Sequence, residues 1–217
     1  MGAVTVGVDI GQRRDPTAIA VVEQEHRGSE THHMARHLER LPLGSPYPAV
    51  AERVAAVVQG VHSVTSGDAP TLYVDATGVG TPIVDVLRGA GVGNLARLVA
   101  VYFTHGDRRK VERDEVKLGK AWLVSRMQAL LQSGLLHLPR TAEAETLGKE
   151  LLDYEIRVTE DANDRYGAFR VGAHDDLVTA LGLATQEDHG GGWATSFRDD
   201  PYGWGDFDSG NRFWSSW

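Results

Sequence analysis

The sequence predicts a mixed α/β fold in which three antiparallel strands are followed by alternating strands and helices. Alternating valines lead into Asp9, a pattern typical of a strand. Two more β-like runs follow, TAIAVVE and HHMARHLERL, and only short segments separate the three. We therefore expect the first three strands to pair antiparallel, in a mixed sheet that is flanked by helices.

The middle of the chain predicts two further strands, each preceded by a helix. Valines between Val50 and Val61 recur at helical spacing. The run TLYVD is a short strand that stops at Asp75, after which Thr81 and Pro82 are suited to begin a helix. RLVAVYF is the next apolar strand.

The last part of the chain predicts three helices and a hairpin. A long helix is expected from near Asp114, because the apolar residues that follow have helical spacing, and TAEAETLGKELLDY is expected to form a second helix. EIRVTEDANDRYGAFRVG is predicted to be a hairpin with its turn near 161–164. HDDLVTALGLATQE closes the core as a helix.

Length and composition indicate one domain with a tail. The chain has 217 residues, 41% of them apolar, which is enough for one sizeable core. We assign residues 1–187 to the domain and 188–217, rich in glycine, aspartate and tryptophan, to a flexible tail that could anchor on a partner. The absence of cysteine excludes disulfides and thiolate zinc sites. With no membrane-length apolar run and no signal peptide at the N-terminus, we expect a cytoplasmic protein without a membrane partner.

The net charge of −8 is unusual for a protein that binds nucleic acid. The tail contributes part of it, with five aspartates against two arginines. A local basic stretch runs from Arg108 to Arg126. Such a stretch is commonly a solvated helix face, and in a protein that binds nucleic acid it would instead be a DNA-facing surface. Arg109, Lys117 and Lys120 are the predicted contacts to the DNA backbone.

Four aspartates in three distant segments are the strongest functional signal. Asp9 and Asp75 end β-like runs, and Asp175 and Asp176 begin the last helix. Carboxylates that converge repel one another unless a divalent cation neutralises them, so we predict a metal site. The alternatives are a turn-forming Asp9 before Gly11 and N-capping by the pair at the last helix.

Three segments carry a resemblance to a known family. VGVDIGQRRDPTAIAVV, YVDATGVGTPIVDVL and GAHDDLVTALGLA resemble the three acidic motifs of the nuclease domain in the large terminase subunit of tailed bacteriophages, a ribonuclease-H-like fold. The likeness spans about residues 4 to 187 in the family's order. It implies an endonuclease that cuts concatemeric viral double-stranded DNA during genome packaging.

The resemblance also implies how the site works. Two ions, Mg²⁺ or Mn²⁺, would be held by Asp9, Asp75 and Asp176, with Asp175 assisting, for in-line phosphodiester hydrolysis. His174 and Asp15 are candidates for supporting positions. No G-x-x-x-x-G-K-[ST] loop is present, so the chain is expected to be either the isolated nuclease half of a large terminase or a nuclease made separately from the ATPase motor. The portal and the small terminase subunit are further candidate partners.

Two other interpretations stay open. The segment GVDIG is also similar to the first phosphate loop of actin-like sugar kinases and chaperone ATPases, which would make the chain a fragment of such an enzyme. A catalytically silent DNA-binding or portal-binding module would retain the fold and suit the acidic charge. The histidines at 32, 33 and 37 do not form a credible zinc site.

Overall fold

The structure is a computed structural model that describes residues 2–11, 15–65, 69–78, 81–104, 108–158, 164–167 and 174–186. The chain divides into two compact units, Met1–Gln186 and Glu187–Trp217, and every element described below belongs to the first. The predicted tail at 188–217 lies outside the described residues. The flexibility of the tail and its anchoring on a partner therefore remain predictions.

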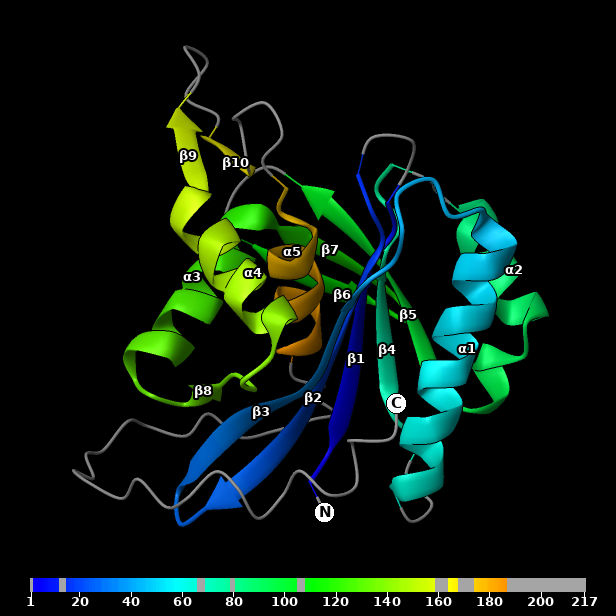
Figure 1. Cartoon of the computed structure of the whole chain (residues 1–217), viewed down its shortest axis with the longest axis horizontal. Helices are drawn as coiled ribbons and strands as arrows, with labels where there is room; N and C mark the ends of the chain where they lie inside the picture. Colours follow the sequence, from blue (N-terminus) through cyan, green and yellow to red (C-terminus); the bar gives the residue numbers. More distant parts are fainter. Residues whose placement is uncertain are drawn as a thin grey trace. The chain divides into compact units, whose positions relative to one another are not determined.

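One mixed sheet forms the centre of the first unit (Figure 1). Within the described residues it has eight strands in the order β6-β7-β5-β4-β1-β2-β3-β8. The three opening strands pair antiparallel, as predicted: β1 Val4–Asp9, β2 Ala18–Arg27 and β3 Glu30–Arg40. On the other side of β1, two strands run parallel to it: β4 Thr71–Asp75 and β5 Arg97–Thr104. The short β8, Leu136–His137, pairs parallel with β3.

Helices cover both faces of this sheet (Figure 1). One face carries α1 Tyr47–Val64 and α2 Thr81–Gly89, with the 3-10 turn η1 Val92–Asn94. The other face carries α3 Lys120–Gln132, α4 Ala142–Asp153 and α5 Asp176–Ala184. The predicted hairpin is present as β9 Glu155–Val158 and β10 Asp164–Gly167, and its turn lies outside the described residues. None of the described helices is long and apolar enough to cross a bilayer.

The helix predicted from near Asp114 was wrong over its first turns. Residues 109–119 form a hairpin of two strands, β6 Arg109–Glu112 and β7 Glu115–Gly119, and α3 begins only at Lys120. Arg113 adopts a φ of 56°, which allows the tight reversal. Val116 and Leu118 are buried while Glu115 and Lys117 are exposed, the period-2 pattern of a strand. The basic stretch is therefore divided between a sheet-edge hairpin and a helix.

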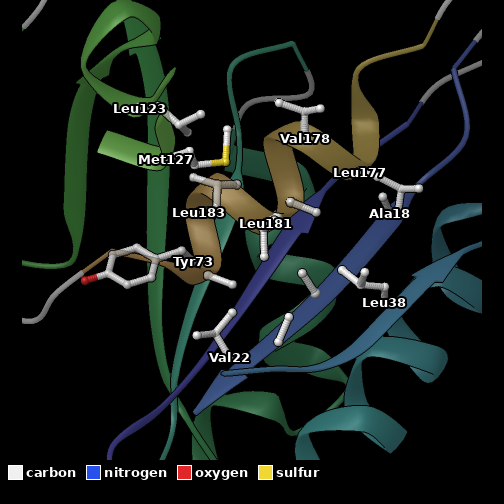
Figure 2. Packing of buried hydrophobic residues seen from close by; sticks show 14 of the residues in the cluster. Ala18, Val22, Leu38, Tyr73, Leu123, Met127, Leu177, Val178, Leu181 and Leu183 are labelled. Atoms are coloured by element: carbon white, nitrogen blue, oxygen red, sulfur yellow. The ribbon is translucent and has the colours of Figure 1, made fainter. Parts of the chain in front are cut away.

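Helix α5 is the element that the core holds most tightly, since all nine of its residues are buried. A β-carbon added at Gly7 of β1 would lie 2.1 Å from the carbonyl oxygen of Ala180, so glycine allows α5 to approach the strand closely. Figure 2 shows Leu177 and Leu181 of α5 within the cluster of buried side chains that also contains Met127 of α3. Because each buried leucine contributes roughly 2 kcal/mol, the start of α5 is firmly placed over the sheet.

Candidate active site

Asp9 and Asp75 lie side by side at one edge of the sheet. They are the last residues of β1 and β4, which run parallel with Val8 opposite Val74. One residue further along each strand, the two acids therefore leave the sheet at neighbouring positions. The carboxyl ends of parallel strands are where α/β proteins commonly form their sites.

The start of α5 brings the second pair of acids to the same edge. Asp175 precedes the first residue of the helix, Asp176. The side chain of Asp175 makes no capping hydrogen bond, so capping does not account for that acid. All four predicted acids border one pocket of about 730 Å³. Its other lining residues are Ile10, Gly11, Asp15, Gly44, Ser45, Pro46, Tyr47, Gly78, Lys120 and Thr179.

The pKa values of Asp9 and Asp75 are both raised, although a lysine lies in the same pocket. Burial raises the pKa of Asp9 well above its ordinary value, and the charges of Asp75, Asp175 and, more weakly, Asp176 raise it further against the opposing charge of Lys120. Burial also raises the pKa of Asp75, although hydrogen bonds from Thr77 and the charge of Lys120 act in the other direction. The backbone N–H of Thr77 donates to Asp75 Oδ1 at 2.8 Å.

The donor set fits a hard divalent cation. Carboxylate oxygens are the ligands that Mg²⁺ and Mn²⁺ prefer. In the described part of the chain, no three acidic or histidine side chains are grouped as a ready-made metal site. Mutual repulsion keeps like charges apart, and a cation between Asp9, Asp75 and the α5 acids would remove that repulsion.

The two predicted supporting residues lie beside each other. His174 Nδ1 is 3.6 Å from Asp15 Oδ1, and Asp15 is also part of the pocket wall. Asp15 is largely exposed, with 71% of its side chain accessible, whereas His174 is about one-third exposed. Asp15 is thus an exposed residue of the pocket wall, and His174 lies next to it without lining the pocket.

The three predicted DNA contacts occupy different places. Lys120, the first residue of α3, lines the pocket, and its ammonium also lies 5.3 Å from the ring centre of Phe103. Lys117 lies on β7, 3.8 Å from the carboxylate of Glu112, and Arg109 lies on β6. Neither Lys117 nor Arg109 is a lining residue. Among the described residues, Lys120 is the cation of this pocket.

Two residues that the sequence did not point to are in contact with the site. Arg40, the last residue of β3, forms ion pairs with both Asp176 and Glu150 of α4. Arg40 is 110 residues away from Glu150 in the sequence and 136 residues away from Asp176, so no local pattern indicates these contacts. The only available hint was an arginine at the end of a predicted strand, the position that Asp9 and Asp75 also occupy.

The sheet order, the antiparallel opening and the acids at one edge define the ribonuclease-H-like class of fold. Solved structures similar to this chain include the large terminase nuclease of thermophilic phage G20c, at 21% identity and a TM-score of 0.59 over 84% of this chain and 80% of that one. The same nuclease with bound magnesium has 22% identity and a TM-score of 0.59, covering 84% and 79%. The manganese-soaked human cytomegalovirus terminase nuclease domain has 21% identity and a TM-score of 0.52, covering 83% and 81%.

These likenesses establish the fold: the chain has the architecture of large terminase nuclease domains. The ribonuclease-H-like mixed sheet predicted from the sequence is confirmed. Neither the protein-family models nor the curated proteins match the chain.

Proposed function

We propose that this chain is a divalent-metal-dependent endonuclease that cuts viral double-stranded DNA during genome packaging. The observation that carries the proposal is the convergence of Asp9, Asp75 and the α5 acids on one pocket, where the charges of the other acids raise the pKa of Asp9. An acid with a raised pKa in a pocket is typical of a functional site, and binding a cation would account for this group of acids. The terminase nucleases of similar fold, solved with magnesium or manganese, support the choice of ion.

Each pocket residue has a separate task in the proposed reaction. Asp9 and Asp75, with one or both α5 acids, would hold Mg²⁺ or Mn²⁺ at the end of the sheet. Bound there, two such ions would supply a more acidic water and stabilise the negative charge on the leaving 3′ oxygen. Lys120 would place the phosphate of the DNA backbone beside the ions held by the acids, and the buried sheet would keep Asp9 and Asp75 in fixed positions.

A plasmid assay tests the proposal. Supercoiled DNA is incubated with the protein and Mg²⁺ or Mn²⁺, with and without chelator, beside Asp9→Asn, and an RNA duplex of matched sequence tests the preference for DNA. Metal-dependent nicking that the substitution abolishes is the expected result. ATP turnover without cleavage would instead favour the kinase-like interpretation, and DNA binding alone would favour the silent module.

The setting of the activity belongs to the same proposal. In a packaging machine, the portal, the small terminase subunit or an ATPase motor would be the partners, in the cytoplasm of the host cell. The predicted contacts Arg109 and Lys117 on the β6–β7 hairpin would extend the DNA path beyond the pocket. Such contacts give binding that tolerates sequence and weakens with salt.

A further inference from the structure

The strand register places Asp9, Ala18 and Arg40 in one row, meaning directly opposite one another across β1, β2 and β3. Asp9 pairs with Ala18 of β2, and Ala18 pairs with Arg40 of β3. Residues directly opposite each other in antiparallel strands project from the same face, and each strand step is about 4.8 Å. Arg40 therefore lies two strands from Asp9, on the face that α5 covers.

Arg40 binds one of the two α5 acids, Asp176, through two nitrogens of its guanidinium. Its Nε donates to Asp176 Oδ2 at 2.6 Å, and its Nη2 donates to Asp176 Oδ1 at 3.2 Å. The same Nη2 donates to Glu150 Oε1. The side chains of Asp176 and Glu150 are only 3% and 6% exposed, so two buried carboxylates share one cation, Arg40, whose side chain is 26% exposed.

Glu150 takes the place of a helix cap. Its Oε2 accepts hydrogen bonds from the backbone N–H groups of Leu177 at 3.1 Å and Val178 at 3.3 Å. These N–H groups lie in the first turn of α5, where a helix has no partners of its own. Glu150 of α4 thus caps α5. The side chain of Asp175 makes no capping hydrogen bond and is free to act in the pocket.

The two α5 acids consequently have different surroundings. Both oxygens of Asp176 are bound by Arg40. Asp175 lines the same pocket as Asp9 and Asp75, its side chain makes no capping hydrogen bond, and its charge contributes to the raised pKa of Asp9. Asp175 also acts on Asp75.

We propose that Arg40 and Glu150 are positioning residues of the nuclease site: they hold Asp176 and the first turn of α5, so that Asp175 is the acid turned towards the metal ion. This inference rests on the proposed function for the identity of the ion. It modifies the prediction from the sequence, which preferred Asp176 as the ligand and gave Asp175 an assisting role.

The test measures Mn²⁺ binding by calorimetry and thermal unfolding for the full chain. Asp175→Asn is expected to weaken Mn²⁺ binding more than tenfold without lowering the unfolding temperature. Asp176→Asn is expected to lower the unfolding temperature and to retain tighter Mn²⁺ binding than Asp175→Asn. The opposite pattern would overturn the proposal.

Arg40→Lys and Glu150→Gln test the positioning role directly. Residues that orient metal ligands typically change metal affinity about 10- to 100-fold, so both variants should weaken Mn²⁺ binding by roughly that factor. The matched control is Arg36→Lys on the same strand, since Arg36 pairs with Glu23 and Glu25 away from the pocket. It should alter stability and leave Mn²⁺ affinity unchanged. Normal Mn²⁺ binding by folded Arg40→Lys would refute the role, and if that variant does not fold, Asp175→Asn still decides the assignment.

Plasmid cleavage measured in parallel separates this inference from the proposed function. A wild-type protein that binds Mn²⁺ through Asp175 but does not cut DNA ends the nuclease proposal and leaves the positioning intact. A wild-type protein that cuts DNA, with Arg40→Lys binding Mn²⁺ as tightly, ends the positioning proposal and leaves the nuclease intact.

Discussion

Two groups of carboxylates, one at the end of the sheet and one along its strands, have opposite surroundings. The pocket acids, Asp9, Asp75 and Asp175, line one cavity, where the charges of Asp75 and Asp175 raise the pKa of Asp9. The strand acids, Glu23, Glu25 and Glu39 of β2 and β3, each meet an arginine. Arg36 Nε is 2.9 Å from Glu23 Oε2, and Arg53 Nε is 2.9 Å from Glu39 Oε1.

The difference in pKa follows from these partners. Burial would raise the pKa of Glu39, but hydrogen bonds from His37 and Arg53 outweigh it and lower the pKa to about 2. Burial and like charges both raise the pKa of Asp9. The sheet therefore neutralises its structural acids with arginine and leaves the acids at its edge for a ligand. This contrast distinguishes a candidate site from a structural salt bridge more clearly than the number of acids does.

Neutralising a pocket acid should have the largest effect. Asp9→Asn removes a proposed metal ligand, whose loss would cost several kcal/mol of charge stabilisation, so plasmid nicking should fall by about a thousandfold. Without metal, the same change should raise the unfolding temperature, because it removes one of several repelling charges. Calorimetry without added metal checks the second effect. If Asp9→Asn were fully active and less stable than the wild type, the pocket acids would not differ from the strand acids.

Metal should stabilise the wild-type fold through the pocket acids alone. At about 100 times its dissociation constant, Mn²⁺ adds roughly 2.7 kcal/mol, or about 5 to 10 °C in unfolding temperature for a chain of this size. Asp9→Asn should lose this shift, and chelator should reverse it in the wild type. The control Glu39→Gln should keep it, since Glu39 is paired with Arg53. An equal shift in both variants would mean that the ion binds elsewhere.

The pocket lysine should matter more than the hairpin lysine. Lys120→Met removes a cation next to the acids, and a charge-assisted contact of this kind is worth about 1.5 to 3 kcal/mol, so cleavage should fall about 10- to 100-fold. Lys117→Met is the matched control, because Lys117 is half exposed and 3.8 Å from Glu112. It should reduce cleavage about twofold and flatten the salt dependence of DNA binding. Equal losses in initial rate would contradict the assignment of Lys120 to the pocket.

The smallest effect is expected at a strand acid. The lowered pKa of Glu39 means that its ion pair stabilises the fold fully above its unfolded pKa of about 4.5 and loses that contribution as pH falls towards about 2. Glu39→Gln should therefore reduce stability by roughly 1 kcal/mol or less at pH 7 and have no effect near pH 2. Denaturant unfolding between pH 7 and pH 2 measures the difference in unfolding free energy between Glu39→Gln and the wild type. Glu52→Gln, at an exposed position, is the control. A deficit that persists at low pH would mean that packing, not charge, is responsible.

The fold and the acids were predictable because their signals are local. Strand β4 has the bounds that the run TLYVD indicated, and Asp9 and Asp75 are recognisable as acids at strand ends. The hairpin at 109–119 was missed because a short run with two buried residues fits a helix as well as a strand. Only its parallel pairing with β5 decides in favour of the strand.

By itself the sequence determined five strands of the sheet, β1 to β5, together with the acids that end two of them and the helix that begins with acids, since periodicity and strand ends are properties of neighbouring residues. The tertiary structure alone decided that Arg40 lies in the row of Asp9, that Glu150 caps α5, and that Lys120 rather than Lys117 reaches the pocket. These contacts depend on strand register and helix packing. A shift of one residue in register would turn Arg40 to the opposite face, and no local pattern reports that choice.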